Sequence, residues 1–365
     1  MRTLNDVNRI VVKVGTTSLT DGGQISESKI KLLVDDIASV REKGYEVILV
    51  SSGAIAAGAG DLNMKRDCLT IPQKQALAAV GQTLLINEYR KQFAKKGIKV
   101  GQMLLTEDDV KNRKRFLNAR NTFNALLQMK VLPIVNENDS VVVSEIKIGD
   151  NDTLSAHVVS VTDSQLLILL SDVDGFYWDL SNSKPVELIN KITNEIMERA
   201  GGTGSTLGSG GMLTKIRAAD MIIKCGEKMI IARGSERNII GRIIAGENIG
   251  TLFVGDNKKM PSRKKWLAIS KAKGTIIIDD GAYSALTEGK KSLLPSGIAK
   301  IEGTFDVGSS VDICDLKGNI IAKGLSNYTD AELGLIKGKS KKEIEKIMGC
   351  KYMDEAVHRD NIIVF

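Results

Sequence analysis

Short apolar runs alternate with helical patterns along the first 257 residues, and this alternation is the strongest constraint on the fold. The run RIVVKVGT, residues 9–16, precedes a segment over 26–44 with apolar residues at helical spacing, and a second apolar run, YEVILVSSG, follows over 45–53. A strand, a helix and a strand joined by short turns form a βαβ unit, which places two parallel strands in one sheet. Because the pattern continues to about residue 257, we expect one doubly wound α/β domain over 1–257.

The pattern changes in the last quarter of the chain. Residues 274–365 contain short β-type runs separated by glycine turns, with little helical pattern between them. Such spacing is typical of a small all-β unit, and the segment is long enough to fold alone. We therefore predict a second, small β-barrel-like domain over 274–365.

The net charge of +7 raises the question of a nucleic-acid partner, and the distribution of the charge argues against one. Residues 258–273 carry seven Lys or Arg and no Asp or Glu, so one short segment holds the whole excess. Residues 274–365 carry 12 basic and 14 acidic residues, whereas an RNA-binding face is normally basic. We interpret 258–273 as a solvated basic linker and do not expect RNA as a partner.

Several other classes of protein are disfavoured by composition. The N-terminus lacks the apolar core of a signal peptide, and no run approaches the roughly 18 apolar residues of a membrane span, so we expect a cytoplasmic protein without a membrane partner. The four cysteines form no CxxC pair and there are only two histidines. A zinc centre or a Ser/His/Asp hydrolase is therefore not expected, and the chemistry must depend on lysines, carboxylates and backbone groups.

Polar residues and glycines follow four of the predicted strands, where open parallel sheets bind their ligands. Taken singly, each junction can be a turn or a helix cap, but four of them at one edge of a sheet predict an anion-binding site. The residues at these four junctions are Lys13 with Gly15 and Thr16, Ser52 with Gly53, Asn136 to Asp139, and Ser171 with Asp172.

The segment GGTGSTLGSGGMLTK, residues 201–215, is rich in glycine and small hydroxyl residues. Its composition alone fits a flexible linker, but a lysine and a periodic helical pattern follow at once, as expected of a loop that wraps a polyphosphate. Neither GxxxxGK[ST] nor GxGxxG occurs in the chain, so a nucleotide site must belong to another family.

The stretch EIKIGDNDTLSA, residues 145–156, places Asp150, Asn151 and Asp152 at a predicted helix start. Phosphoryl transfer requires cations on the spreading charge, oxygen ligands for a metal, and groups that hold both reactants in line. Two lysines, Lys13 and Lys215, together with this acidic cluster supply such a set. Without an external charge to bind, the two aspartates would be only a helix cap.

Many stretches of the chain together resemble the glutamate 5-kinases, which have the amino acid kinase fold. They are VVKVGTTSL, SSGAIAAG, GQMLLT, RFLNARNT, VNENDSV, EIKIGDNDTLSA, SDVDGFY and GSGGMLTKIRAAD. The stretches SLLPSGI and AVHRDNI resemble the PUA domain that bacterial members carry. The resemblance implies a three-layer α/β/α sandwich with a mainly parallel sheet, a PUA domain, and ATP-dependent phosphorylation of L-glutamate to glutamyl 5-phosphate, the first step of proline biosynthesis.

The resemblance also implies roles for individual residues. Lys13 and Lys215 match the lysines that stabilise the transferring phosphoryl group, and Asp152 and Asp150 match the acids that organise the site. Mg²⁺ comes with ATP, and Asp150 is the candidate for a direct protein ligand. The residues implied for glutamate are Ser52, Gly53, Asp139, Asn151 and, in a flap region, Lys147. The residues implied for the nucleotide are Lys13, Ser171, Asp172, Ser209, Gly210, Gly211, Met212, Leu213, Thr214 and Lys215.

One position departs from the family pattern, since Ser171 stands where the family usually has threonine, a change that keeps the hydroxyl. The resemblance further implies proline as a feedback inhibitor and a homo-oligomer, either a dimer or a tetramer. Two alternatives remain open at this point. One is a related kinase acting on aspartate, acetylglutamate, carbamate or a nucleotide, and the other is an RNA-binding protein, because PUA domains elsewhere bind RNA.

Overall fold

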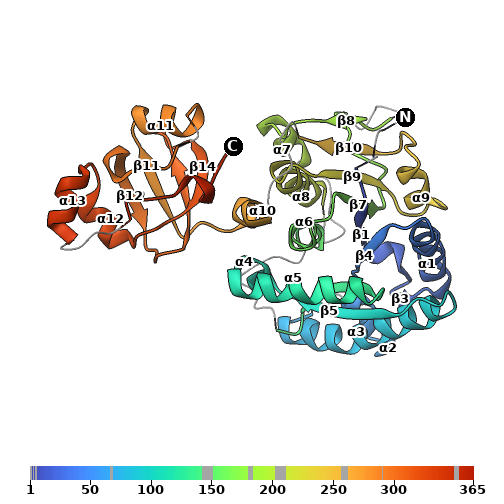
Figure 1. Cartoon of the computed structure of the whole chain (residues 1–365). Coiled ribbons are helices and arrows are strands. Elements are labelled where there is room, and N and C mark those ends of the chain that lie inside the picture. Colours follow the sequence, from blue (N-terminus) through green and yellow to red (C-terminus); the bar gives the residue numbers. More distant parts are fainter. Residues whose placement is uncertain are drawn as a thin grey trace. The chain divides into compact units, whose positions relative to one another are not determined.

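The computed structural model describes residues 2, 4, 6–65, 69–141, 151–179, 184–201, 211–255, 262–289, 291–348 and 353–365. The chain divides into two compact units, Met1–Lys259 and Met260–Phe365 (Figure 1). In the described ranges, no helix is both long and apolar enough to cross a membrane.

The first unit is built on an eight-stranded sheet, in which β9 and β10 are antiparallel and all other neighbouring strands are parallel. The mainly parallel sheet that the alternating sequence pattern predicted is confirmed. In order across the sheet, the strands are β5 (Val100–Leu105), β6 (Leu132–Glu137), β4 (Glu46–Val50), β1 (Arg9–Val14), β7 (Leu166–Ser171), β9 (Lys228–Arg233), β10 (Thr251–Val254) and β8 (Leu188–Ile189).

Helices cover both faces of this sheet, which gives the three-layer sandwich (Figure 1). One face carries α1 (Glu27–Glu42), α3 (Ile71–Ala94) and α9 (Ile239–Ile244). The other carries α5 (Arg113–Gln128), α6 (Asn151–Thr162) and α8 (Met212–Lys224). The smaller elements of this unit are η1 (Thr16–Ser18), β2 (Thr20–Asp21), β3 (Gln24–Ile25), α2 (Ala54–Asp61), α4 (Glu107–Lys111) and α7 (Asn194–Ala200).

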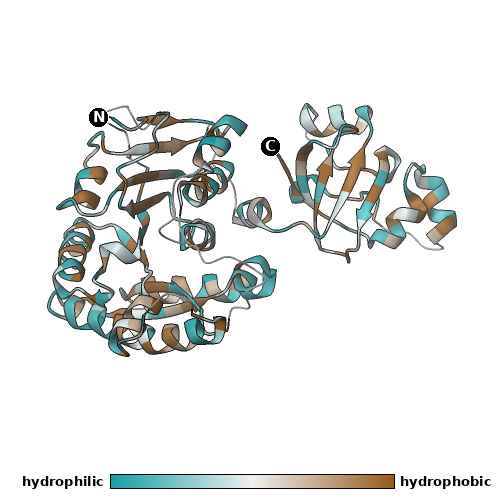
Figure 2. Cartoon of the chain, turned by 180° about the vertical axis from the view of Figure 1, so that it is seen from behind, coloured by the Kyte–Doolittle hydropathy of each residue, from teal (hydrophilic) through white to brown (hydrophobic). Residues whose placement is uncertain are grey.

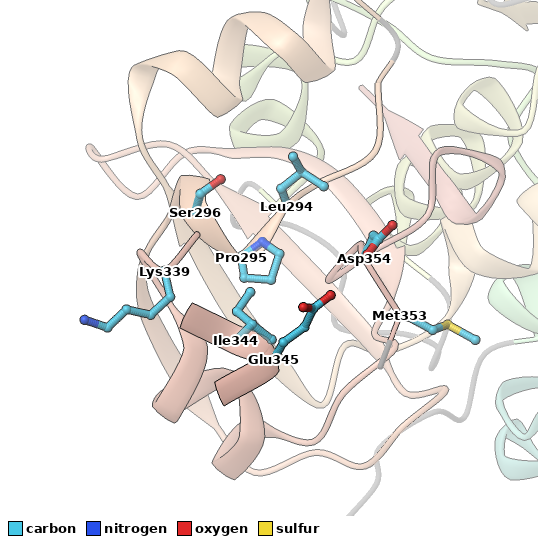
Figure 3. A pocket seen from close by; sticks show the side chains of 8 residues that line it. All are labelled: Leu294, Pro295, Ser296, Lys339, Ile344, Glu345, Met353 and Asp354. Atoms are coloured by element: carbon cyan, nitrogen blue, oxygen red, sulfur yellow. The ribbon is translucent and has the colours of Figure 1, made fainter. Parts of the chain in front are cut away.

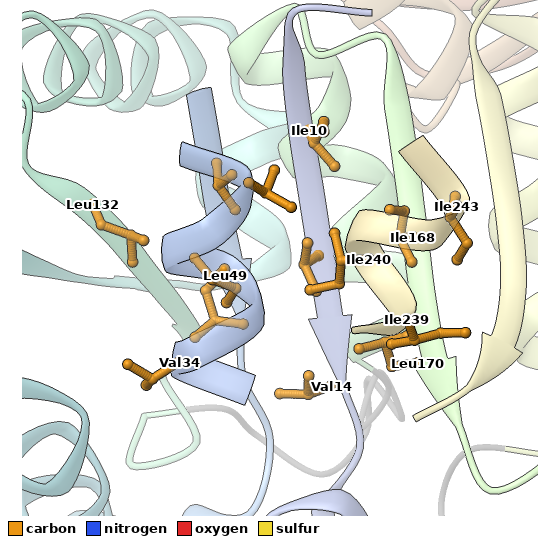
Figure 4. Close-up of a cluster of buried hydrophobic side chains, with 14 of the residues drawn as sticks. Ile10, Val14, Val34, Leu49, Leu132, Ile168, Leu170, Ile239, Ile240 and Ile243 are labelled. Carbon is orange, nitrogen blue, oxygen red and sulfur yellow. The ribbon is translucent and has the colours of Figure 1, made fainter. Parts of the chain in front are cut away.

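The alternation of side chains along β1 determines which face of the sheet receives Lys13. Ile10, Val12 and Val14 join the apolar core under α1 and α9 (Figure 4). Because successive side chains of a strand point to opposite faces, Lys13 points to the other face, where α6 and α8 lie. The sequence of β1 therefore places one buried lysine on the side of the sheet opposite to this core cluster.

Two glycines allow α2 and α3 to cross at very short distance. A Cβ atom built on Gly81 would lie 1.8 Å from the carbonyl oxygen of Ala54, and one on Gly58 would lie 2.0 Å from that of Leu77. Any side chain at either position would force the two helices apart. This crossing fixes the position of α3 against α2, which begins directly after the turn that follows β4.

The second unit contains a five-stranded sheet around its own apolar core, which includes Ile276, Val311 and Ile313. Figure 2 shows apolar strands in this unit, with hydrophilic residues concentrated on the helices. The strands in sheet order are β12 (Ile298–Gly303), β11 (Gly274–Ile278), β13 (Ser310–Cys314), β14 (Ile320–Leu325) and β15 (Ile362–Val364).

Short helices occupy more of this second unit than the sequence pattern indicated. They are α10 (Ser262–Ile269), α11 (Asp280–Thr287), η2 (Pro295–Gly297), α12 (Asp330–Ile336), α13 (Lys341–Met348) and η3 (Arg359–Asn361). Each of α11 and α12 begins at a side-chain cap, Asp279 and Thr329 respectively, a local signal that short helices need. Helix α10 lies within the segment that we interpreted as a solvated linker, yet its Trp266 and Leu267 are buried.

A cavity of about 290 Å³ opens in the second unit beside η2 and α13 (Figure 3). Its walls combine apolar side chains, among them Pro295 and Ile344, with Lys339 and Glu345. The lining is therefore of mixed character and carries both signs of charge.

We expect Gly81→Ala to destabilise the first unit by about 3 kcal/mol, because the new methyl group collides with backbone rather than with a movable side chain. Gly241→Ala is the matched control, since a Cβ there meets only Asp36 Oδ1 at 3.6 Å and helical alanine is favoured by about 0.5–1 kcal/mol. Urea unfolding followed through Trp178 in a Trp266→Phe background reports on the first unit. Equal stability of the two glycine variants would contradict the close crossing.

Candidate active site

Polar residues from four strands and two helix starts meet at the carboxyl edge of the first unit's sheet. Lys13 stands near the end of β1, and Ser52 and Gly53 follow β4. Asn136 and Ser171 lie at the ends of β6 and β7, and the first turns of α6 and α8 reach the same edge. The edge therefore holds lysines, amides, hydroxyls and a carboxylate.

Asp152 lies between Lys13 and Lys215 and forms an ion pair with each. Its Oδ1 contacts Lys13 Nζ, and its Oδ2 lies 3.0 Å from Lys215 Nζ. The side chain of Asp152 is fully buried, and the two lysines are each 5 % exposed. Two ammonium groups from β1 and α8 are thus held within the span of one carboxylate, which itself projects from the first turn of α6.

The two lysines keep Asp152 charged in spite of its burial. Burial on its own would raise the pKa of Asp152, but the charges of Lys13 and Lys215 outweigh it and hold the pKa below the usual value. The hydroxyl of Thr214 also donates to Asp152 Oδ2 at 3.1 Å. The carboxylate thereby anchors the first turn of α8 through two consecutive residues.

Asn151 connects the start of α6 to the turn that follows β4 and to the end of β6. Its Nδ2 lies 2.9 Å from the carbonyl oxygen of Ser51, 2.8 Å from Ser52 Oγ and 3.1 Å from Asn136 Oδ1. Three acceptors around one nitrogen fix the orientation of the amide. Within the described part of the chain, Asn151 Oδ1 is buried and has no hydrogen-bond partner, so it remains available to a donor on a ligand.

The turn after β4 requires glycine at position 53. Gly53 has φ 100°, in the left-handed region, and it is the N-cap of α2. Residues with a Cβ atom rarely adopt this conformation. The turn leaves Ser52 beside Asn151 and directs the first N–H groups of α2 toward the same edge of the sheet.

Asp139 lies in the loop after β6 and lines a cavity of about 190 Å³ together with Gln82 and Glu137. Burial raises the pKa of Asp139 to about 6. Burial disfavours the ionised form of this carboxyl group, and a cation that enters the cavity would stabilise that form. The cavity therefore suits a ligand that carries an ammonium group.

The residues predicted for the nucleotide lie in two places. Ser171 Oγ donates to Asp172 Oδ1 at 2.9 Å, and both residues line a cavity of about 790 Å³ between α1 and the segment that leads to α9. The predicted residues Gly211, Met212, Leu213, Thr214 and Lys215 form the start of α8. Because the N-cap Gly211 has no side chain, the first N–H groups of α8 are left for an anion.

Four of the predicted site residues lie outside the described residues, and their roles stay predictions. They are Lys147, Asp150, Ser209 and Gly210. Within the described ranges, no group of three or more His, Cys, Asp or Glu side chains could hold a metal ion. The carboxylate oxygens of Asp152 contact Lys13, Lys215 and Thr214 instead.

Sequence reasoning did not identify two side chains that contact the site from α3. Gln82 Oε1 accepts a hydrogen bond from Asn136 Nδ2 at 2.6 Å, and the Tyr89 hydroxyl lies 3.0 Å from Ser51 Oγ. Both residues sit in the middle of a long helix, where no local motif distinguishes them. Asn136 itself was identified in the sequence from its position at the end of a predicted strand.

Comparison with protein families divides the chain as the structure does. Residues 8–233 match the amino acid kinase family, and residues 274–348 match the PUA domain. The first match covers the sheet edge described above, and the second covers most of the second unit.

Several curated proteins are similar to the chain over almost its whole length. The glutamate 5-kinase of Syntrophotalea carbinolica is 46 % identical over 366 residues, which cover 99 % of this chain and 98 % of that protein. The glutamate 5-kinase of Caldanaerobacter subterraneus subsp. tengcongensis is 48 % identical over 362 residues, which cover 98 % and 97 %.

We expect Asp152→Asn to lower the free energy of unfolding of the first unit by about 3 kcal/mol or more at pH 7, because two buried ammonium groups lose their counter-charge. The pKa of Asp152 is lowered in the folded state, so its contribution is complete above the ordinary value of 3.8 and disappears as the pH falls through the folded value. The difference between wild type and variant should therefore shrink in acid.

The matched control for this test is Glu195→Gln, which breaks an exposed pair with Arg199 at 3.3 Å. That change should alter stability by less than about 0.5 kcal/mol. An Asp152→Asn protein as stable as the control at pH 7 would contradict the structural role of the carboxylate.

Proposed function

The chain belongs to the glutamate 5-kinase group of the amino acid kinase family, and we propose that it transfers the terminal phosphoryl group of ATP to the side-chain carboxylate of L-glutamate. The product is L-glutamyl 5-phosphate, and the reaction is the first step of proline biosynthesis. The observation that carries the proposal is the cluster of Lys13, Asp152 and Lys215 beside the amide of Asn151.

In this proposal Lys13 and Lys215 stabilise the charge that spreads over the phosphoryl group during transfer. Phosphoryl transfer needs positioning and electrostatic stabilisation more than covalent chemistry from the protein. Asp152 holds both ammonium groups in place before substrate arrives, so little reorganisation is needed when the charge develops. Asp152 is thus a positioning group for the two catalytic cations, and we propose the same organising role for Asp150.

In this scheme L-glutamate binds on the side of Lys13 where Asn151 and Ser52 lie. Asp139 and the unpartnered Oδ1 of Asn151 accept from the substrate ammonium group, while Ser52 and the turn at Gly53 supply donors to a carboxylate. Lys147 is proposed as a further contact to substrate. The γ-carboxylate then faces the lysine pair, which is the geometry that an in-line transfer requires.

We place the triphosphate of ATP against the first turn of α8, with Ser209 and Gly210 completing the loop and Ser171 and Asp172 contacting the nucleoside. The positive end of α8 and Lys215 favour an anion at this position. Mg²⁺ is proposed as an ion carried by the triphosphate, where it would neutralise phosphate charge. Among the described residues, no group of three or more His, Cys, Asp or Glu side chains could hold it.

The wider properties of the protein follow from the same proposal. Proline, which carries an amine and a carboxylate like glutamate, is proposed to inhibit at or near the glutamate pocket. We further propose a cytoplasmic homo-oligomer, either a dimer or a tetramer, without RNA or a membrane as a partner. The near-neutral charge of residues 274–365 supports the exclusion of RNA.

The proposal is tested by ADP release with ATP, Mg²⁺ and a panel of acceptors, because the same fold also serves other acceptors. L-Glutamate should support turnover at least about tenfold above L-aspartate, N-acetyl-L-glutamate, carbamate and UMP, and hydroxylamine should trap the acyl phosphate as a hydroxamate. Lys215→Met is the inactive control, expected to lower kcat by about 10² or more. Turnover of aspartate but not glutamate would refute the assignment.

A second test uses the pKa of Asp139, which is about 6 in the free protein. Protonation below that pH removes the charge that the substrate ammonium group requires, so the KM for glutamate should rise about fourfold between pH 7.5 and 5.5. The KM for ATP should change much less over this range. In Asp139→Asn the KM for glutamate should be high and nearly independent of pH. A KM that still rises about fourfold between pH 7.5 and 5.5 in this variant, as in wild type, would contradict the role of Asp139.

A further inference from the structure

A chain of three side-chain amides connects α3 to the first residue of α6. Asn136 Nδ2 donates to Gln82 Oε1 at 2.6 Å, and Asn151 Nδ2 donates to Asn136 Oδ1 at 3.1 Å. Asn136 Oδ1 also accepts from the backbone N–H of Glu137 at 2.9 Å. The three amides come from a helix, a strand and a second helix, and the middle one is buried.

The hydrogen bond to Gln82 and the N–H of Glu137 together set the direction of the middle amide, one at its nitrogen and the other at its oxygen. An amide side chain offers an acceptor on one atom and donors on the other, so its partners decide which way it points. With Gln82 Oε1 as acceptor, Asn136 turns its nitrogen toward α3 and its oxygen toward Asn151. Asn151 in turn directs its nitrogen at Asn136, Ser51 and Ser52, and its oxygen is left for a ligand.

Gln82 is itself held in place by the crossing of α2 and α3. It directly follows Gly81, whose Cα approaches the carbonyl oxygen of Ala54 so closely that a Cβ would lie 1.8 Å from it. The backbone of α3 at this point has little freedom to shift. The amide chain therefore starts at the helix crossing and ends at the amide of Asn151.

We propose that Gln82 is a positioning residue for glutamate binding, acting through Asn136 to present Asn151 Oδ1 to the substrate ammonium group. The proposal rests on the proposed function, because glutamate is the ligand that the aligned amide receives. Gln82 touches no reacting atom in this scheme. Its loss should therefore weaken glutamate binding and leave the phosphoryl transfer step and ATP binding almost unchanged.

The first test is Gln82→Met, which keeps the length of the side chain and removes the acceptor. We expect the KM for glutamate to rise about tenfold, with kcat and the KM for ATP within about twofold of wild type. Asn87→Met, at an exposed amide on the same helix, is the control and should behave as wild type. A wild-type KM for glutamate in Gln82→Met, or a fall in kcat without a change in KM, would overturn the proposal.

A double-mutant cycle separates action through Asn151 from a merely structural role. If Gln82 works through that amide, Gln82→Met should raise the KM for glutamate by less than about twofold in an Asn151→Ala background. Full additivity of the two effects would overturn the proposed connection. Should Gln82→Met melt early, Gln82→Leu measured below its melting temperature provides the same comparison.

The two levels of proposal fail in different ways. A wild-type chain that does not phosphorylate glutamate refutes the proposed function and this inference with it. An active wild-type enzyme combined with an unaffected Gln82→Met refutes only the positioning role.

Discussion

The candidate active site depends on one fully buried carboxylate that is shared by two buried lysines. Without a counter-charge, Lys13 and Lys215 would repel each other. Because both are buried, each would also bear the free-energy cost of a charge removed from water. Asp152 offsets both penalties at once. The same contact ties together β1, α6 and α8, so the proposed catalytic charges and the packing of three core elements share a single interaction.

The order of residues in β1 makes that interaction possible. A strand that is buried on both faces can carry a lysine only if the layer that the lysine points into supplies a counter-charge. Helix α6 supplies this charge from its first turn. On the other face of this strand, Ile10, Val12 and Val14 pack in the apolar cluster under the helices. The apolar cluster under α1 and α9 and the lysine pair beside α6 and α8 thus lie on opposite faces of β1.

The proposed glutamate pocket uses a different kind of organisation, with amides in place of ion pairs. Asn151 and Asp152 are consecutive, yet one belongs to the network that leads to α3 and the other to the lysine pair. The first turn of α6 consequently takes part in both networks. A shift of this turn would disturb both networks together.

The sequence by itself determined the fold class, the edge of the sheet where polar residues gather and the family, because periodicity and motifs are local properties. It also singled out Lys13, Asp152 and Lys215. Only the tertiary structure decided that Asp152 meets both lysines, one of them 63 residues away, that Ser171 and Asp172 line a separate cavity, and that Gln82 joins the amide network. Those facts depend on which faces of distant strands and helices pack together, and no local pattern records that.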